Sequence, residues 1–247
     1  MQNNNIEIEK INIIINKDKK LIKINDLITH TKYNNINKVN ELINIGADPN
    51  VQDNEGKTAL YWASNKGYKE CVKILLKNGA NPNIQDNKFK TALCFTSLNR
   101  YNECVEILLK NGANPNIQDN NGETALYWAL YNSYNKECIE ILLKNGADPN
   151  IQDNKGKTAL MYTTNQEYIE ILLKNRADPN IQDNNGNTVL IIFSWYGYKD
   201  CIKILLKNGA DPNIQNNDRY IAYDVSKTEE IKKILKKNSY NNNTIDN

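Results

Sequence analysis

The side chains most often used for catalysis or metal binding are scarce in this chain. It holds one histidine, His30. A Cys2His2 zinc site needs two histidines. A hydrolytic triad needs a histidine base together with a nucleophile and an acidic residue, so a single histidine makes either site difficult to form. The sequence has no CxxC, P-loop or GxGxxG motif. We interpret His30 as a helix-surface residue and predict no catalytic, cofactor-binding or metal-binding site.

Four of the five cysteines recur about every 33 residues, or at twice that interval. They are Cys71, Cys104, Cys138 and Cys201, and Tyr168 fills the intervening equivalent position. Repetition of this kind points to equivalent positions on stacked helices, which lie about 10 Å apart. That separation is too wide for one metal ion or for a disulfide. The pattern therefore predicts buried core residues, and we interpret Cys94 in the same way.

An aspartate also recurs once per repeat, within a polar stretch. These residues are Asp53, Asp86, Asp119, Asp153 and Asp183. A calcium site needs several oxygens that converge on one point, which such wide spacing does not provide. Asp side chains in turns commonly accept hydrogen bonds from nearby backbone amides. We predict that each aspartate organises its own turn.

The composition excludes several classes of protein. Among 247 residues, 31 Lys and Arg stand against 29 Asp and Glu, a net charge of +2, so a strongly basic nucleic-acid binder is disfavoured. No apolar run reaches the roughly 18 residues of a membrane span. A basic segment followed by an apolar core, as in a secretory signal, is missing at the N-terminus. We expect an intracellular, cytoplasmic protein whose thiols are reduced.

The elements that position these residues are internal repeats. All six prolines fall in one motif, with successive spacings of 33, 33, 34, 30 and 33 residues. The surrounding text nearly repeats, as in GADPNVQDN, GANPNIQDN and GADPNIQDN, and TALYWA and ILLKNGA also recur. Repeats of this period indicate a solenoid of stacked units.

Each unit is predicted to contain two short helices and a loop. Thr58 is suited to cap a first helix over residues 59–63, which Gly67 ends. Apolar residues at three- and four-residue spacing predict a second helix over residues 68–77. Gly79 is suited to the left-handed residue that closes that helix, and a hairpin-like loop follows.

This arrangement resembles the ankyrin repeat. The residues that carry the resemblance are Asp53, Gly56, Thr58, Ala59, Leu60, Val72, Leu75, Leu76, Gly79, Ala80 and Asn83, with equivalents in later units. The usual Pro and His of the T-P-L-H motif are replaced here by Ala and by Tyr, Cys, Met or Ile. We predict an all-α ankyrin-repeat solenoid of six to seven repeats over residues 24–237, with capping repeats at both ends. Residues 1–23 are expected to form a tail or an extra capping element, and residues 238–247 a disordered tail.

The resemblance implies a protein-interaction module whose partner docks on the concave side, at the hairpin tips and the exposed ends of the first helices. Residues at those positions vary between repeats, as a recognition surface or neutral drift would make them vary. The candidates for partner binding are Lys57, Lys90, Glu123, Tyr131, Lys157, Trp195 and Tyr196. A different position is expected to form a core ladder without a binding role; it holds Trp62, Phe95, Trp128, Tyr162 and Ile192.

Other functions remain open at this point. The chain could be an adaptor that presents a target to machinery such as a ubiquitin ligase, although no adaptor-recruiting domain is recognisable after the repeats. An enzyme lacks a supporting constellation, and a weak nucleic-acid binder would depend on a modest strip of lysines. We expect a monomer that binds a partner protein and uses no cofactor, small-molecule substrate or membrane.

Two irregularities mark the fourth full repeat. Between Thr158 and Thr188 the period is 30, and we place the missing residues at the turn between the helices. Arg176 stands where other repeats have the closing glycine. These changes either shape a pocket or are tolerated drift.

Overall fold

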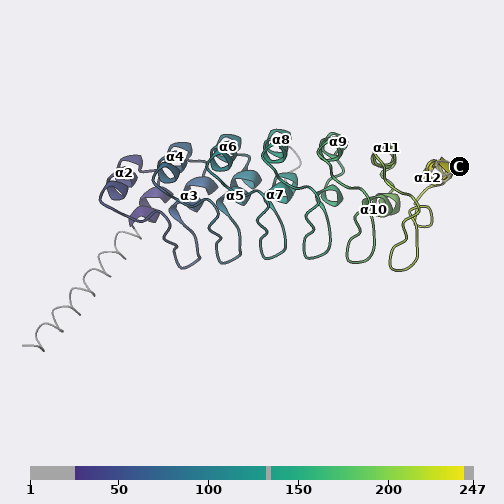
Figure 1. The fold of residues 1–247 in the computed structure, drawn as a ribbon, viewed down its shortest axis with the longest axis horizontal. Helices are drawn as coiled ribbons and strands as arrows, with labels where there is room; N and C mark the ends of the chain where they lie inside the picture. The colour runs from purple at the N-terminus through teal and green to yellow at the C-terminus, as the bar shows by residue number, and fades with distance from the viewer. Residues whose placement is uncertain (1–25, 132–134, 242–247) are drawn as a thin grey trace, which may run out of the picture. The chain divides into compact units, whose positions relative to one another are not determined.

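The computed structural model describes residues 26–131 and 135–241 (Figure 1). Within these ranges every regular element is helical and no strand is present. The chain divides into two compact units, residues 1–117 and 118–247. The predicted all-α repeat fold is confirmed. The segment predicted as an N-terminal tail, residues 1–23, lies outside the described residues.

The first unit stacks helix pairs in two rows. Residues 26–32 are helical, and the further elements are α2 (Ile36–Asn44), α3 (Ala59–Asn65), α4 (Lys69–Lys77), α5 (Ala92–Asn99) and α6 (Asn102–Lys110). Helix α3 packs against α4 of its own repeat and α5 of the next, and α4 packs against α6. In Figure 1, α2, α4 and α6 form an outer row, and the loops project beyond the inner row of α3 and α5.

The second unit repeats this arrangement. Its elements are α7 (Ala125–Tyr131), α8 (Lys136–Lys144), the 3-10 helix η1 (Ala159–Tyr162), α9 (Gln166–Lys174), α10 (Val189–Tyr196), α11 (Lys199–Lys207) and α12 (Glu229–Asn241). The inner elements α7, η1 and α10 pack in series, as do the outer helices α9, α11 and α12. Helix α12 extends four residues beyond the predicted boundary at residue 237, and residues 242–247 lie outside the described part.

The helix ends follow the predicted signals. The Thr58 hydroxyl accepts a hydrogen bond from the Tyr61 amide at 3.1 Å and so caps α3. Gly79 closes α4 with φ +86°, and its amide donates to the Leu76 carbonyl at 3.1 Å. Arg176 adopts the same left-handed conformation, with φ +69°, after α9.

The core lies between the two rows of helices in each unit. The predicted burial of the repeated cysteine position is confirmed, because all five cysteines are buried with free thiols. Tyr168, at the same position of the fourth full repeat, is also buried. Leu75 and its equivalents fill the neighbouring positions without exposure to solvent.

The fourth full repeat differs from the prediction. The sequence predicts that the three missing residues shorten the turn between the helices, but in the structure the first helix is shortened as well. That helix is reduced to η1, four residues long, whereas α10 has eight. Thr163 then adopts an extended conformation and Asn165 caps α9, so the chain has no room for a second helical turn.

Candidate functional site

Each hairpin loop is built around its aspartate, as predicted. Asp53 Oδ1 accepts hydrogen bonds from the amides of Glu55 and Lys57, both at 3.0 Å. The same pair of bonds forms at the other four aspartates. In the last loop Asn216 replaces aspartate, and its Oδ1 accepts equivalent bonds from Asp218 and Tyr220.

Successive hairpins within a unit are bonded to one another. Gln52 Nε2 donates to the Gly56 carbonyl at 2.6 Å and to the Gln85 carbonyl of the next repeat at 2.9 Å. The Asn87 amide donates to the Glu55 carbonyl at 3.0 Å. A Cβ added to Gly56 would lie 2.8 Å from the Asn87 amide nitrogen, so this close approach requires glycine. The tips are therefore held in fixed positions within each unit.

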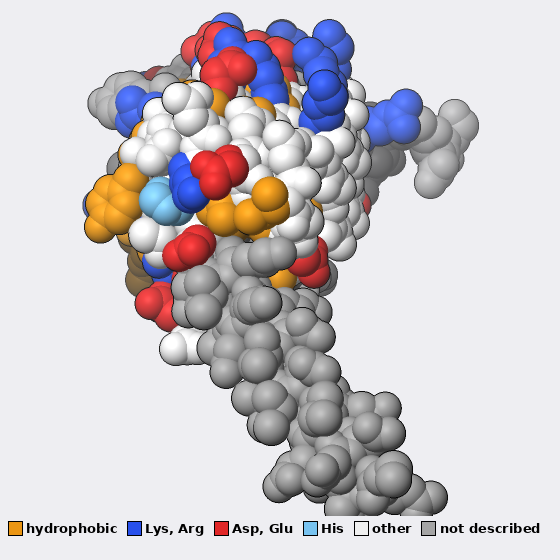
Figure 2. Space-filling view, turned by 90° about the vertical axis from the view of Figure 1, so that its left-hand side faces the viewer, with side chains coloured by type: hydrophobic (Ala, Val, Ile, Leu, Met, Phe, Trp, Pro, Cys, Tyr) orange, Lys and Arg blue, Asp and Glu red, His pale blue; other side chains and the backbone are white. Residues whose placement is uncertain are grey.

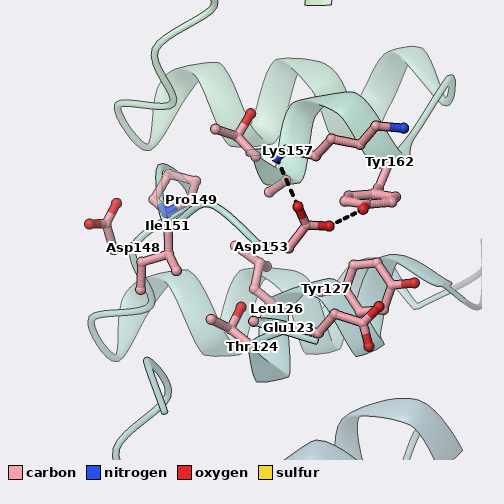
Figure 3. A pocket seen from close by; sticks show the side chains of 13 residues that line it. Glu123, Thr124, Leu126, Tyr127, Asp148, Pro149, Ile151, Asp153, Lys157 and Tyr162 are labelled. Carbon is pink, nitrogen blue, oxygen red and sulfur yellow. Dashed lines mark hydrogen bonds between the residues drawn. The ribbon is translucent and has the colours of Figure 1, made fainter. Parts of the chain in front are cut away.

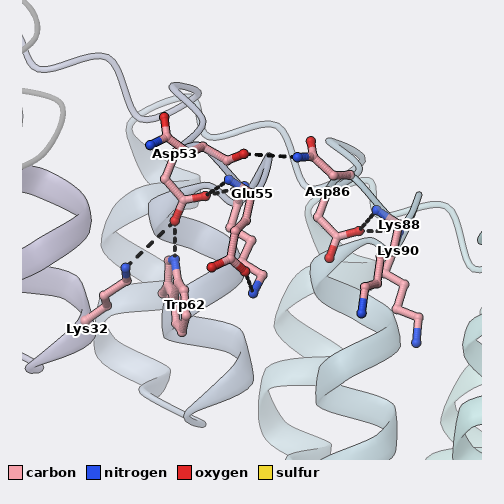
Figure 4. A network of polar contacts seen from close by, with 10 residues as sticks. Lys32, Asp53, Glu55, Trp62, Asp86, Lys88 and Lys90 are labelled. Atoms are coloured by element: carbon pink, nitrogen blue, oxygen red, sulfur yellow. Dashed lines mark hydrogen bonds and ion pairs between the residues drawn. The ribbon is translucent and has the colours of Figure 1, made fainter.

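In the first unit the polar contacts gather around Asp53 (Figure 4). Its Oδ2 accepts from the Trp62 indole at 3.1 Å and lies 3.8 Å from the Lys32 ammonium, which also sits 4.1 Å from the Trp62 ring centre. Burial alone would raise the pKa of Asp53, but the Lys57 amide, the Trp62 indole, the Glu55 amide and the Lys32 charge together hold it below its ordinary value.

The predicted core ladder is wrong. Trp62, Phe95, Trp128, Tyr162 and Ile192 are half-buried rather than buried. The preceding residue takes the core position in most repeats, since Tyr61, Cys94, Met161 and Ile191 are at most 9% exposed. The first helices are so short and so uniformly apolar that their sequence pattern does not fix which side faces the core. The ladder residues instead lie on the hairpin side, next to the predicted contact residues.

Lys57 and Lys90 lie together in the first unit. The Lys57 ammonium pairs with Glu55 and lies 4.9 Å from the Trp62 ring centre, and that of Lys90 lies 5.8 Å from the Phe95 ring centre. Both lysines line a hollow of about 280 Å³ together with Asp86 and Glu55. The basic strip considered from the sequence is thus partly neutralised by carboxylates.

Glu123 and Lys157 lie in the second unit, beside Tyr127 and Tyr162, whose rings are in contact (Figure 3). Tyr162 donates its hydroxyl to Asp153 Oδ2, and its ring meets the Tyr127 ring edge-on at 4.7 Å between centres. Burial, and then the Asp153 carboxylate, raise the pKa of Tyr162. The pocket between these side chains has a volume of about 10 Å³, so it has no room for a ligand.

Tyr131 ends α7 and is 64% exposed. Its ring lies 6.2 Å from that of Tyr127 and 6.0 Å from that of Trp128, between centres. The predicted exposure of this position therefore holds in the structure. What Tyr131 contacts in a partner stays a prediction.

A groove beside α10 contains more of the predicted partner-binding residues than the other hollows described above. This α10 groove has a volume of about 500 Å³ and is lined by Lys157, Asp183, Asn185, Asn187, Ile191, Ile192, Trp195, Tyr196, Asn216, Asp218, Tyr220 and Val225. It brings Lys157, Trp195 and Tyr196 together. Trp195, Tyr196 and Tyr220 are 61%, 58% and 53% exposed, an unusual grouping of large apolar side chains in solvent.

Three groove residues, Tyr220, Asp183 and Asp218, were not predicted from the sequence. Tyr220 follows Asn216 by four residues, as Lys57 follows Asp53, so it occupies the hairpin-tip position of the last loop. Comparison of that position across all six loops would have identified it. Asp183 was assigned a purely structural role in its turn.

The shortened repeat explains why the end of α10 is uncovered. A hollow of about 390 Å³ separates η1 and the following turn from α10, with Tyr162, Thr163, Ile192 and Tyr196 among its walls. In the first unit the equivalent helix ends touch, as where Asn99 bonds to Asn65. Because η1 stops after four residues, the Tyr196 ring stays largely exposed and stacks on the Tyr198 ring, 5.9 Å away between centres.

The outer helices carry charges of both signs that pair with each other. Lys69 lies 2.8 Å from Glu103 in the first unit, and Lys136 lies 2.6 Å from Glu167 in the second. Figure 2 shows acidic and basic side chains intermixed at the top of its view, so neither sign forms a continuous patch there. Such exposed pairs contribute little to stability.

The described part of the chain contains neither a metal-binding cluster nor a helix that could span a membrane. Over residues 26–131 and 135–241, His, Cys, Asp and Glu side chains form no group of three that could hold a metal ion. Over the same residues, each helix is too short or too polar to cross a bilayer.

Comparison with known proteins supports the repeat assignment. A family model for ankyrin repeats in three copies matches residues 2–86, 24–119, 79–153 and 133–216. The crystal structure of the ankyrin repeat domain of Bcl-3, described as a unique member of the IkappaB protein family, is similar with a TM-score of 0.80 and 25% identity, over 85% of this chain and 97% of that one. The ankyrin repeat protein EF0377 gives a TM-score of 0.68 and 26% identity, over 74% and 96% of the two chains.

Curated relatives match over short segments. The potassium channel AKT2 of Oryza sativa subsp. japonica is 40% identical over 50 residues, which is 20% of this chain and 6% of the channel. Acyl-CoA-binding domain-containing protein 6 of Bos taurus is 38% identical over 53 residues, which is 21% of this chain and 19% of that protein. The similarity thus spans less than a fifth of either relative.

Proposed function

The chain belongs to the ankyrin-repeat family, a general protein-interaction fold, and from that premise we propose that it binds a partner protein on the hairpin side of its repeats. The α10 groove is the proposed centre of the binding surface. The observation that carries this proposal is the grouping of Trp195, Tyr196 and Tyr220, each more than half exposed, around a single groove.

Exposed aromatic side chains supply binding energy in a specific way. Trp and Tyr are enriched among the few interface residues whose truncation is costly, because they bury a large area with little conformational freedom to lose. A groove of about 500 Å³ can enclose a side chain or short segment of a partner. Burial of Trp195 and Tyr196 on binding would remove apolar surface that the free protein leaves in water.

The hairpin loops favour binding because they are already ordered. Gln182 Nε2 bridges the Gly186 and Gln215 carbonyls at 2.6 and 2.9 Å, which joins two of the loops that form the groove. Asn216 Nδ2 also donates to Asn187 Oδ1 at 2.9 Å. A partner would not have to order these loops, so less of the interaction energy is lost on association.

The test is truncation of the central aromatic residue. After a partner has been isolated by pull-down from the native cell, Trp195→Ala should weaken its binding by at least about tenfold, since an anchor of this kind commonly contributes about 2 kcal/mol or more. Lys57→Ala, in the first unit, should change the affinity little. Tyr33→Ala is the matched aromatic control, because Tyr33 is 79% exposed and lies outside the groove.

Circular dichroism on each variant separates binding from folding. If Trp195→Ala stays helical and binds the partner normally, the surface lies elsewhere and the proposal is wrong. If Trp195→Ala unfolds the chain, Trp195 has a structural role in place of the proposed one. An equal loss for Tyr33→Ala would also contradict a surface centred on α10.

A further inference from the structure

Asp183 forms part of the wall of the α10 groove and is only 8% exposed. Its Oδ1 accepts hydrogen bonds from the amides of Asn185 and Asn187, both at 2.9 Å. These bonds hold the carboxylate in one orientation. The second oxygen, Oδ2, is left for another partner.

In two other repeats that second oxygen is used within the chain. Asp53 Oδ2 accepts from the Trp62 indole, and Asp153 Oδ2 accepts from the Tyr162 hydroxyl. The residue at this position of the fifth full repeat is Ile192, which has no donor. Among the described residues, no donor reaches Asp183 Oδ2, so this oxygen of a largely buried residue faces the groove opening and is free to accept a hydrogen bond from outside the chain. A charged donor that displaces water from this oxygen would form a charge-assisted hydrogen bond.

The charges around the groove do not compensate Asp183. Asp218 also lines the groove, and in the described part of the chain neither carboxylate has a Lys or Arg within ion-pair distance. Lys157 is the one cation among the lining residues, and its ammonium lies over the Tyr162 ring, 5.6 Å from the centre. The groove therefore carries two carboxylates and one ammonium.

The first unit provides the contrast. Asp86 occupies the same position, is 6% exposed, and makes the same two bonds through Oδ1. Its neighbour at the ladder position is Phe95, which likewise has no donor. There the hollow is also lined by three lysines, Lys57, Lys88 and Lys90. An excess of negative charge thus distinguishes the α10 groove from the equivalent hollow of the first unit.

We propose that the α10 groove binds an arginine side chain presented by an extended segment of the partner protein. Asp183 Oδ2 and Asp218 accept hydrogen bonds from the guanidinium, and Trp195, Tyr196 or Tyr220 packs against its plane. A planar guanidinium suits both contacts, because it donates in its plane while its face stacks on an aromatic ring. This inference rests on the proposed function and names the chemistry that the groove recognises.

The test begins with a library of random twelve-residue peptides displayed on phage and selected against the full chain. We expect the bound peptides to contain an arginine and to lose binding to Trp195→Ala. One such peptide is then synthesised in two forms, with arginine and with citrulline, a neutral residue of nearly the same shape. Citrulline should weaken binding by about tenfold or more, as expected for loss of a charge-assisted contact.

Substitution of the carboxylate completes the test. Asp183→Asn should weaken the arginine peptide by about tenfold and leave the citrulline peptide nearly unchanged. The loop should stay folded, because Asn216 already makes both amide bonds at this position in the last loop. Asp86→Asn makes the same change in the first unit and serves as the matched control. Lys157→Ala should not weaken the arginine peptide, whereas it would weaken an acidic one.

The outcomes separate the two proposals. Peptides that depend on Trp195 but lack an arginine preference, or that bind Asp183→Asn as well as the unaltered chain, would overturn the arginine site and leave the binding surface standing. A preference for lysine over arginine would also overturn it. If the selection yields no peptide whose binding depends on Trp195, the proposed function itself is contradicted.

Discussion

Arg176 offers a direct measure of how much the closing glycine contributes to a repeat. It follows α9 with φ +69°, where Gly79 and Gly209 follow their helices with φ +86° and +88°. A residue with a Cβ pays about 1–2 kcal/mol for this left-handed conformation. We therefore predict that Arg176→Gly stabilises the chain.

The expected change in the free energy of unfolding comes from backbone conformation, because the substitution keeps the hydrogen bonds of this residue. The Arg176 amide donates to the Leu173 carbonyl at 3.1 Å and its carbonyl accepts from Asn150 Nδ2 at 2.9 Å, and glycine can keep both bonds. No acidic side chain of the described residues pairs with the Arg176 guanidinium. Glycine makes the unfolded chain more flexible, which offsets about 0.4–1 kcal/mol of the relieved strain. The net increase in the free energy of unfolding should be about 1 kcal/mol, from the relieved strain less this offset.

Urea denaturation of the variant and the unaltered chain measures this change. Hydrogen exchange should also show residues 158–178 opening before their neighbours in the unaltered chain, and less readily in Arg176→Gly. The reverse change, Gly209→Arg, is the matched control. A Cβ at Gly209 would meet no atom within 4 Å, so its cost should come from backbone strain alone. Destabilisation by Arg176→Gly, or uniform exchange along the second unit, would refute the reasoning.

Two further predictions concern buried and half-buried groups that ionise at high pH. Burial raises the pKa of the Cys104 thiol to about 11 and also raises the pKa of Cys71. The repeated cysteines should therefore resist alkylation in the native protein and react on unfolding. Rapid native labelling of Cys71, Cys104, Cys138 and Cys201 would contradict this, because it would show that the position is accessible. Burial, with nearby carboxylates, also raises the pKa of Tyr61, Tyr127 and Tyr162 above the ordinary 10.0. Below about pH 10 these phenols are neutral in both states, and above it the unfolded chain ionises first, so the free energy of unfolding should fall as pH rises past 10. Tyrosinate absorbance after a jump to alkaline pH should therefore include a phase that follows unfolding, and its absence would contradict the assignment.

Much of the fold follows from local signals in the sequence. Thr58, Gly79 and the cysteine position were identified correctly because a cap, a left-handed closing residue and an apolar stripe on a nine-residue helix each have a distinct pattern. The aspartate in each loop was also recognised from its place in a polar turn. Each of these features follows from a residue type at a set place in a helix or turn, so sequence reasoning reaches them.

The features that sequence reasoning missed depend on how the side chains and the short first helix are oriented in the folded repeat. Trp62 and Tyr162 were predicted to lie in the core, but each donates a hydrogen bond to the aspartate of its own hairpin and lies on the hairpin side. The shortening of η1 and the uncovering of Tyr196 could not be located from a three-residue gap, since the chain can absorb a deletion in a helix or a turn. Asp183 Oδ2 lacks a hydrogen bond because Ile192, nine residues later, has no donor where Trp62 and Tyr162 have one. That relation becomes apparent only in the folded repeat.

The hydrogen bonds from loop glutamines to the next loop affect how the gene that encodes a repeat array can change in length. Gln52 reaches Gln85, Gln152 reaches Gln182 and Gln182 reaches Gln215, each at 2.9 Å, although the sequence separations are 33, 30 and 33 residues. The bond joins neighbouring loops however many residues lie between them. Residues can therefore be lost from the helical part of one copy without shifting the adjoining loops, and a whole copy can be duplicated with its bridging bonds already encoded. Recombination between nearly identical coding segments thus yields arrays whose loops pair correctly, while helix length and surface chemistry are left free to diverge.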